Sequence, residues 1–290
     1  METSELLKKV RKIEIKTRGL SHHIFSGEYH SAFKGKGMTF SEVREYTFGD
    51  DTRMIDWNVT ARFNHPFVKV FEEERELTVM VLIDVSNSGI FGTKKQFKRD
   101  VITEIAAVLA FSAIQNNDKV GVLFFSNKIE KFIPPKKGTT HILRIIRELL
   151  TFESQNKETS ITEALRYFTN AIKKRCIAFL ISDFIDKDFD NALKIAGKKH
   201  DLVALKIYDK REKEIPSLGL VKLKDAETEN IISVDTSSRN VRESYNKWWL
   251  INESKLYEIF SKSGVDFVNI RTDEDYIKPL MRLFKKRGTK

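Results

Sequence analysis

Residues 77–88 read Leu-Thr-Val-Met-Val-Leu-Ile-Asp-Val-Ser-Asn-Ser. The first seven are almost all apolar, which is typical of a β-strand that is covered on both faces. The polar residues behind this strand include Asp84, Ser86 and Ser88, and their alternate spacing lets three oxygen-bearing side chains converge on one point. Because ligands of open α/β sheets bind at the carboxyl ends of the strands, the segment predicts a strand with a binding site at its end.

Buried strands and amphipathic helices alternate along the rest of the chain. Further strands are expected at residues 118–125, 129–133, 176–181, 202–207 and 265–270, with helices at residues 97–115, around 142–150, around 161–172, at 189–199 and from 273 onward. This order predicts an α/β fold, in which a doubly wound, mainly parallel sheet has helices on both faces.

Two segments depart from the α/β pattern. Residues 1–76 begin with an amphipathic helix and continue as a loop-rich, partly β region. Residues 209–235 contain two short strand patterns on either side of a polar tetrapeptide, which predicts an inserted β-hairpin. We therefore expect an N-terminal helix and β-rich region at residues 1–76, and an α/β domain at residues 77–290 that carries the hairpin.

Composition narrows the class of protein. Hydrophobic residues make up 41% of the 290 residues, which is enough for a sizeable core and excludes a largely disordered chain. The apolar runs are far shorter than the roughly 18–20 residues that cross a bilayer, and residues 1–14 lack the apolar core of a signal peptide. The lone Cys176 excludes an internal disulfide. We expect a cytoplasmic protein without a membrane span.

The chain is basic, with a net charge of +10 at pH 7 from 51 Lys and Arg against 41 Asp and Glu. A basic protein can bind nucleic acid, an anionic surface or an acidic protein partner. The charge is spread along the chain and no known nucleic-acid-binding motif accompanies it. We therefore expect no nucleic acid, and a basic nucleic-acid-binding protein stays an alternative.

Two further segments bring oxygen ligands to the same predicted edge of the sheet. Thr159 lies in the loop before the helix around residues 161–172, and Asp183 follows the strand at residues 176–181. Carboxylates and hydroxyls are hard ligands that suit Mg²⁺ or Mn²⁺. Asp, Asn and Ser are also common in turns, because their side chains form hydrogen bonds with the nearby backbone. Thr159 can equally be the N-cap of its helix. The common edge and the chain order favour the metal site.

The order Asp84-x-Ser86-x-Ser88, then Thr159, then Asp183 resembles the metal-ion-dependent adhesion site of von Willebrand factor A domains, over about residues 77–207. The segment before it reads Phe40-Ser-Glu-Val-Arg-Glu-Tyr-Thr-Phe-Gly-Asp-Asp-Thr-Arg-Met-Ile-Asp-Trp-Asn-Val-Thr-Ala-Arg62 and later Val68-Lys-Val-Phe-Glu-Glu-Glu-Arg75. These residues resemble the bacterial family known as domain of unknown function 58 (DUF58). In that family such a segment precedes an A-type domain, and the genes commonly lie beside a MoxR-type AAA+ ATPase.

The resemblance implies a von Willebrand factor A-like fold and a binding role without catalysis. It implies that Asp84, Ser86, Ser88, Thr159 and Asp183 hold Mg²⁺ or Mn²⁺. An acidic side chain of a partner would then complete the coordination of the metal. The resemblance also implies an adaptor that works with a MoxR-type AAA+ ATPase, with an acidic protein client, or with both.

Departures from the family pattern and other chemistries leave alternatives open. The usual Gly-Gly-Thr of the family is Lys157-Glu158-Thr159 here, so Thr162 is an alternative ligand. A phosphatase of the haloacid dehalogenase type would also use Asp84, but it needs a second carboxylate two residues later, where this chain has Ser86. The histidines show no helical pair spacing, which argues against a zinc hydrolase. The charged residues between Arg44 and Arg62 form either a recognition surface or, as we favour, a salt-bridged scaffold.

Overall fold

The computed structural model describes residues 3–20, 39–72, 77–86, 97–154, 156, 158–224 and 231–288. The chain divides into two compact units, one formed by Met1–Phe33 with Leu77–Lys290 and the other by Lys34–Glu76. The predicted metal ligand Ser88 lies outside the described residues. The other four predicted ligands lie in the larger unit.

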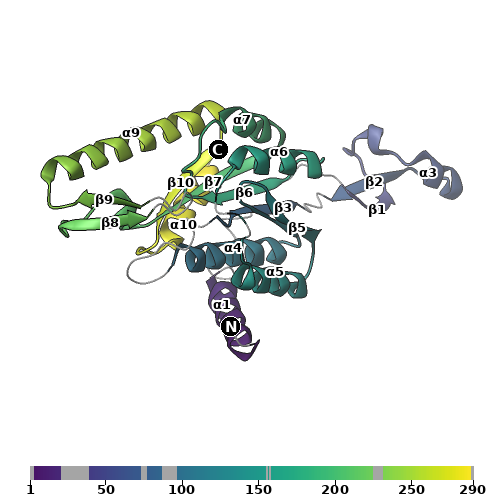
Figure 1. Cartoon of the computed structure of the whole chain (residues 1–290). Coiled ribbons are helices and arrows are strands. Elements are labelled where there is room, and N and C mark those ends of the chain that lie inside the picture. Colours follow the sequence, from purple (N-terminus) through teal and green to yellow (C-terminus); the bar gives the residue numbers. More distant parts are fainter. Residues whose placement is uncertain are drawn as a thin grey trace. The chain divides into compact units, whose positions relative to one another are not determined.

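The larger unit is built on a six-stranded sheet with the strand order β10-β7-β6-β3-β4-β5 (Figure 1). In chain order its strands are β3 (Thr78–Asp84), β4 (Lys119–Phe125), β5 (Ile129–Lys136), β6 (Ile177–Ser182), β7 (Asp201–Tyr208) and β10 (Asp266–Arg271). Neighbouring strands are parallel except β4 and β5, which pair antiparallel. The predicted α/β sheet is confirmed, and β3 lies between β6 and β4 at its centre.

Helices cover both faces of this sheet (Figure 1). One face packs against α1 (Thr3–Leu20), α4 (Lys98–Gln115), α5 (Thr139–Thr151) and α10 (Ile277–Gly288), and the other against α6 (Ile161–Ala171), α7 (Asp190–Lys199) and α9 (Arg239–Ser263). The side chains of β3 alternate between the two cores, with Val81 in one and Leu82 in the other, which explains its continuous apolar run. Across the described ranges, every helix is too short or too polar to cross a membrane.

The edge strand β5 is longer than predicted. It continues past residue 133 to Lys136 and includes Pro134 and Pro135, where the sequence pattern indicated that the strand ends. Proline cannot donate a ladder hydrogen bond, so within sheets it is confined to edge strands and bulges. Both conditions hold here, because β5 is an edge strand and its register with β4 shifts between Val120 and Val122.

The predicted hairpin follows β7. The chain first forms the short helix α8 (Lys210–Lys213) and then pairs β8 (Leu220–Lys224) with β9 (Ile231–Asp235). These two strands form an antiparallel sheet of their own, separate from the six-stranded sheet. The insertion expected at residues 209–235 is thus a hairpin, as predicted.

The smaller unit contains a second hairpin and a helix. It pairs β1 (Thr39–Glu45) antiparallel with β2 (Phe67–Glu72) and adds the 3₁₀ helix η2 (Thr52–Met54) and the helix α3 (Trp57–Phe63). The sequence patterns did not predict α3. Its signal is the N-cap Asp56, whose carboxylate accepts hydrogen bonds from two backbone N–H groups of the first helical turn.

An exposed ion pair holds a turn of the smaller unit in place. Arg44 forms a two-pronged ion pair with Asp50, with distances of 2.8 Å from Nη1 to Oδ2 and 2.7 Å from Nη2 to Oδ1. Asp50 also accepts a hydrogen bond from the backbone N–H of Thr47, and these contacts hold the pKa of Asp50 well below its usual range. Two of the charged residues between Arg44 and Arg62 therefore stabilise a turn of their own unit, which supports the scaffold interpretation.

Candidate functional site

Asp84 ends the central strand β3 and is almost fully buried. Its Oδ1 accepts a hydrogen bond from the backbone N–H of Ser86 at 3.0 Å, as expected of a tight turn after a strand. Its Oδ2 accepts a hydrogen bond from the hydroxyl of Ser182 at 2.7 Å. Ser182 is the last residue of the neighbouring strand β6, so two strand ends hold the Asp84 carboxylate in place.

Asp183 follows Ser182 at the same edge and is also buried. The chain turns sharply after it, because Phe184 has a φ of 57° and its backbone N–H donates to Ser182 Oγ at 3.0 Å. A left-handed φ is unusual for an aromatic residue and costs conformational energy. Ser182 therefore supports both predicted carboxylate ligands, Asp84 through its hydroxyl hydrogen and Asp183 through the turn that follows it.

A buried lysine lies beside Asp183. The Nζ atom of Lys98, in the first turn of α4, is 3.2 Å from Asp183 Oδ2 and 2.5 Å from Glu212 Oε1. Burial alone would lower the pKa of Lys98, but the charges of Asp183 and Glu212 outweigh it and the pKa is raised. Lys98 is therefore a permanent cation at the carboxyl edge of the sheet.

The two predicted carboxylate ligands repel each other. Burial, and then the negative charge of Asp183, raise the pKa of Asp84 to about 7, although hydrogen bonds from Ser182 and Ser86 offset part of the shift. Lys98 balances the charge of Asp183, but it shares its own charge with Glu212. The carboxylates Asp84, Asp183 and Glu212 outnumber the cations near them, Lys98 and Lys206, and a bound divalent cation would relieve the repulsion between Asp84 and Asp183.

Thr159 lies in the loop that leads into α6, close to the end of β4. The backbone N–H of Ser160 donates to the carbonyl of Ser126 at 2.9 Å, and that of Ile161 donates to Asp186 Oδ2 at 2.7 Å. These bonds anchor the loop to the segments that follow β4 and β6, so Thr159 belongs to the same edge as Asp84 and Asp183. The N-cap of α6 is Ser160, whose side chain accepts from the N–H of Glu163.

The alternative ligand Thr162 is engaged elsewhere. Its hydroxyl donates a hydrogen bond to the backbone carbonyl of Asp188 at 3.2 Å, at the start of α7. Thr159 is not the helix cap, because Ser160 has that role. Thr162 and Ser160 thus have hydrogen-bonding roles of their own, in the contact with Asp188 and in the cap of α6.

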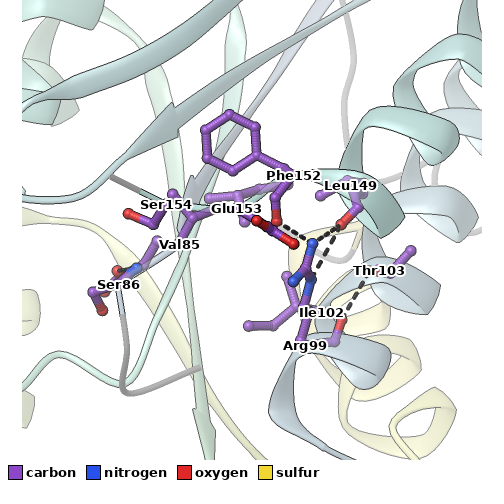
Figure 2. Close-up of a pocket in the computed structure, with 11 residues that line it drawn as sticks. Val85, Ser86, Arg99, Ile102, Thr103, Leu149, Phe152, Glu153 and Ser154 are labelled. Atoms are coloured by element: carbon purple, nitrogen blue, oxygen red, sulfur yellow. Dashed lines mark hydrogen bonds between the residues drawn. The ribbon is translucent and has the colours of Figure 1, made fainter. Parts of the chain in front are cut away.

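A cavity of about 150 Å³ lies beside Asp84 and Ser86, between β3, α4 and the end of α5 (Figure 2). Figure 2 shows Arg99 of α4 reaching the last carbonyls of α5, where its guanidinium donates to Leu149 O at 3.1 Å and to Phe152 O. A cation is favourable at a helix C-terminus, because it satisfies carbonyls that have no partner within the helix. Arg99 thereby holds in place the segment after α5, which lines one side of the cavity.

Sequence reasoning missed three residues of this edge. Ser182 could have been found, because it directly precedes a predicted ligand at a strand end. Glu212 is the third residue after Asp209, and the two form a capping box at the start of α8, a pattern that is visible in the sequence. Lys98 has no local signal, since its partners come from distant parts of the chain.

The donor set fits a hard divalent cation such as Mg²⁺ or Mn²⁺. The edge brings together two buried carboxylates, Asp84 and Asp183, with the buried hydroxyl of Ser86 and the loop of Thr159. Mg²⁺ is usually bound by one or two carboxylates and keeps several water molecules. Within the described ranges no three His, Cys, Asp or Glu side chains gather as a metal-binding group, so a metal here would depend on hydroxyls and water as well.

Comparisons with known proteins find a matching family model and relatives that cover nearly the whole chain. The profile of the family described as "Protein of unknown function DUF58" matches residues 42–254. The uncharacterized protein Rv1480 of Mycobacterium tuberculosis is 25% identical over 292 residues, which covers 99% of this chain and 91% of Rv1480.

The solved structure of one bacterial protein has a similar fold. The conserved hypothetical protein BatB from Bacteroides thetaiotaomicron has a TM-score of 0.50 at 17% identity, covering 74% of this chain and 100% of BatB. The VWA domain of SpRpn10 has a TM-score of 0.41 at 10% identity, covering 73% of this chain and 95% of that domain. The likeness to BatB concerns the fold alone, and the von Willebrand factor A-like fold predicted from the sequence is confirmed.

Proposed function

We propose that this chain, which belongs to the DUF58 family of proteins of unknown function, is a metal-dependent protein-binding module. One observation carries the proposal. Asp84 and Asp183 are buried side by side at neighbouring strand ends, joined through Ser182, and burial and the charge of Asp183 raise the pKa of Asp84. Such an edge has the chemistry to hold a divalent cation that a partner's carboxylate can reach.

Each residue has a distinct part in the proposed site. Asp84 and Asp183 would supply the charge that attracts Mg²⁺ or Mn²⁺, and the hydroxyls of Ser86 and Thr159 would supply neutral ligands. Ser88 belongs to the same run of sequence as Ser86 and is proposed as a further hydroxyl ligand. When bound, the cation supplies an open coordination position for a carboxylate oxygen of the partner.

We propose a binding role and no catalysis. A phosphatase that uses Asp84 as its nucleophile would need a second carboxylate at the position of Ser86, as general acid. The Asp84 carboxylate is also held on both oxygens, by Ser86 N and Ser182 Oγ, and is buried. These features suit a fixed ligand better than a nucleophile that must reach a substrate.

The proposed partner is a MoxR-type AAA+ ATPase, an acidic client protein, or both. The ATPase follows from the family resemblance of residues 40–75, and the acidic chemistry follows from the open metal position. The net charge of +10 would speed the encounter with an acidic surface and would lose this effect at high salt. The chain would then act as an adaptor that links the ATPase to its client.

The proposal is tested by partner capture with and without metal. The chain and the neighbouring ATPase are co-expressed, and co-purification is measured in Mg²⁺ and in EDTA at low salt. We expect capture in Mg²⁺ only, and loss of capture in Asp84→Ala and in Ser86→Ala. Equal capture in EDTA, or equal capture by both variants, would refute a metal-dependent role. Turnover of generic phosphatase substrates by the wild type, if Asp84→Asn abolishes it, would point to a hydrolase instead.

A further inference from the structure

A larger cavity, of about 490 Å³, lies on the other face of the sheet, between the loop after β6, the end of β7 and the helix α9. Lys206 of β7 and the neighbouring Trp248 and Trp249 of α9 line it, together with residues 183–190. Cavities that hold small ligands usually measure about 300–1,000 Å³. The volume is therefore sufficient for a ligand of the size of an amino-acid side chain or larger.

Lys206 is the unusual member of this lining. Only 5% of it is exposed, and it stands opposite Ser182 in the parallel register of β7 with β6. Its ammonium lies over the ring of Trp249, with Nζ 4.7 Å from the ring centroid. Among the residues that the structure describes, none accepts a hydrogen bond from Lys206 or forms an ion pair with it.

Two of the four carboxylates that line the cavity are engaged with other groups. Asp183 pairs with the ammonium of Lys98, and Asp186 accepts hydrogen bonds from the backbone N–H groups of Ile161 and Lys187. Burial accordingly lowers the pKa of Lys206, because nearby negative charges only partly offset the loss of water. The ammonium of Lys206 has an aromatic ring as its main contact, and an anion in the cavity would balance its charge and accept hydrogen bonds from it.

We propose that this cavity is a binding site for a single carboxylate attached to an apolar group, with Lys206 as the charged partner of the carboxylate. The inference goes beyond the metal site and does not depend on it. The carboxylate can come from an acidic side chain of a protein segment or from a free small acid. Both share the same chemistry, and the experiment below distinguishes them.

The walls of the cavity define the class of ligand. The indole of Trp248 and the side chain of Ile185 are about half exposed, and Ile259 and Leu256 add further apolar surface. These groups suit an aromatic or aliphatic body next to the carboxylate. Asp188 and Asp190 also line the cavity, and their negative charges disfavour a phosphate or another anion that carries more than one charge.

The test compares matched probes with the full-length chain in EDTA. 4-Phenylbutyrate and its neutral amide differ only in the charged group, and the peptide N-acetyl-Phe-Glu-Phe amide and its Gln counterpart repeat the comparison with a side-chain carboxylate. Binding is followed by tryptophan fluorescence and by calorimetry. Lys206→Met is the test variant and Lys255→Met is its control, because Lys255 lines the same cavity without being buried.

We expect at least one of the two carboxylates to bind the wild type at least tenfold more tightly than its neutral counterpart. Lys206→Met should abolish this preference, and Lys255→Met should retain it. The tighter of the two carboxylates identifies the source, a free acid or a protein segment. Equal binding of acid and amide by the wild type, no binding of any probe at millimolar concentration, or an unchanged preference in folded Lys206→Met would each overturn the proposal.

Discussion

Lys98 and Asp183 form a buried ion pair at the carboxyl edge of the sheet, with Nζ 3.2 Å from Oδ2, although 85 residues separate them in the chain. The same ammonium lies 2.5 Å from Glu212 Oε1, in the capped first turn of α8. The protein thus carries a cation of its own beside a proposed metal ligand. That cation stabilises Asp183 when no metal is bound, and it opposes a divalent cation by charge repulsion.

The first prediction follows from this opposition. Lys98→Met is expected to tighten Mg²⁺ binding by about tenfold or more, because a unit positive charge is removed from a poorly solvated site. Without metal the variant should lose about 3 kcal/mol of unfolding free energy, since Asp183 and Glu212 lose their buried counter-ion. Calorimetric titration and urea unfolding measure the two effects. Lys98→Arg keeps the charge and is the control, and Mg²⁺ binding by Lys98→Met no tighter than by this control would contradict the prediction.

The second prediction concerns pH. The Asp84 carboxyl titrates near 3.8 in the unfolded chain, whereas its pKa in the folded protein is raised to about 7. Between these values the folded state binds more protons than the unfolded state, so this group makes the free energy of unfolding fall as pH rises. The group contributes its full stabilisation below about pH 4 and none of it above about pH 7.

Asp84→Asn isolates this contribution, because the amide has the shape of the carboxyl group and does not titrate in this range. Urea unfolding in EDTA at pH 5 and pH 8 compares the two proteins. Relative to Asp84→Asn, the wild type should be less stable at pH 8 than at pH 5. A stability difference between the two proteins that does not change with pH would show that Asp84 is ionised throughout.

The third prediction separates the two threonines. Thr159→Val should weaken Mg²⁺ binding by about tenfold, because it removes a proposed hydroxyl ligand. Thr162→Val should leave Mg²⁺ binding unchanged and cost only about 1 kcal/mol of stability, since the hydroxyl of Thr162 donates to the Asp188 carbonyl. Paramagnetic broadening by Mn²⁺ is a suitable measurement for both variants. The opposite order of effects would make Thr162 the ligand.

The fourth prediction concerns Ser182. Ser182→Ala removes the donor to Asp84 Oδ2 and the acceptor of the Phe184 N–H, and it should cost about 1–3 kcal/mol of unfolding free energy. The pKa of Asp84 should also rise further, because a hydrogen bond to its charged form is lost. Ser112→Ala is the matched control, since Ser112 is equally buried but bonds only to a helix carbonyl. Comparable pH dependence of unfolding in the two variants would argue against a special role for Ser182.

The fifth prediction concerns Arg99. Arg99→Met keeps the apolar stem but removes the donors to the carbonyls of Leu149 and Phe152, and it should cost about 1–2 kcal/mol of stability. Hydrogen exchange should become faster at the end of α5 and in the segment that follows it. Arg144 lies at an exposed position of α5, and Arg144→Met should change neither the stability nor the hydrogen exchange appreciably. Equal exchange in the two variants would mean that Arg99 does not hold this segment.

The order of strands and helices was predictable from the sequence, because strand and helix periodicity are properties of neighbouring residues. The run from Leu77 to Asp84 indicated a strand buried on both faces, and the structure places it at the centre of the sheet. The same local patterns predicted the inserted hairpin. They failed where tertiary context decides, as at Pro134 and Pro135, which continue β5 only because that strand lies at the sheet edge.

For the site, the sequence by itself determined the residue types at the strand ends, including Asp84, Ser86 and Asp183, and the chain order that carries the family resemblance. Only the tertiary structure decided what surrounds them. Lys98 meets Asp183, and Lys206 meets Trp249, because the fold brings distant segments together and removes water from between them. Burial of this kind raises the pKa of Asp84 and lowers the pKa of Lys206, and no periodicity of neighbouring residues encodes it.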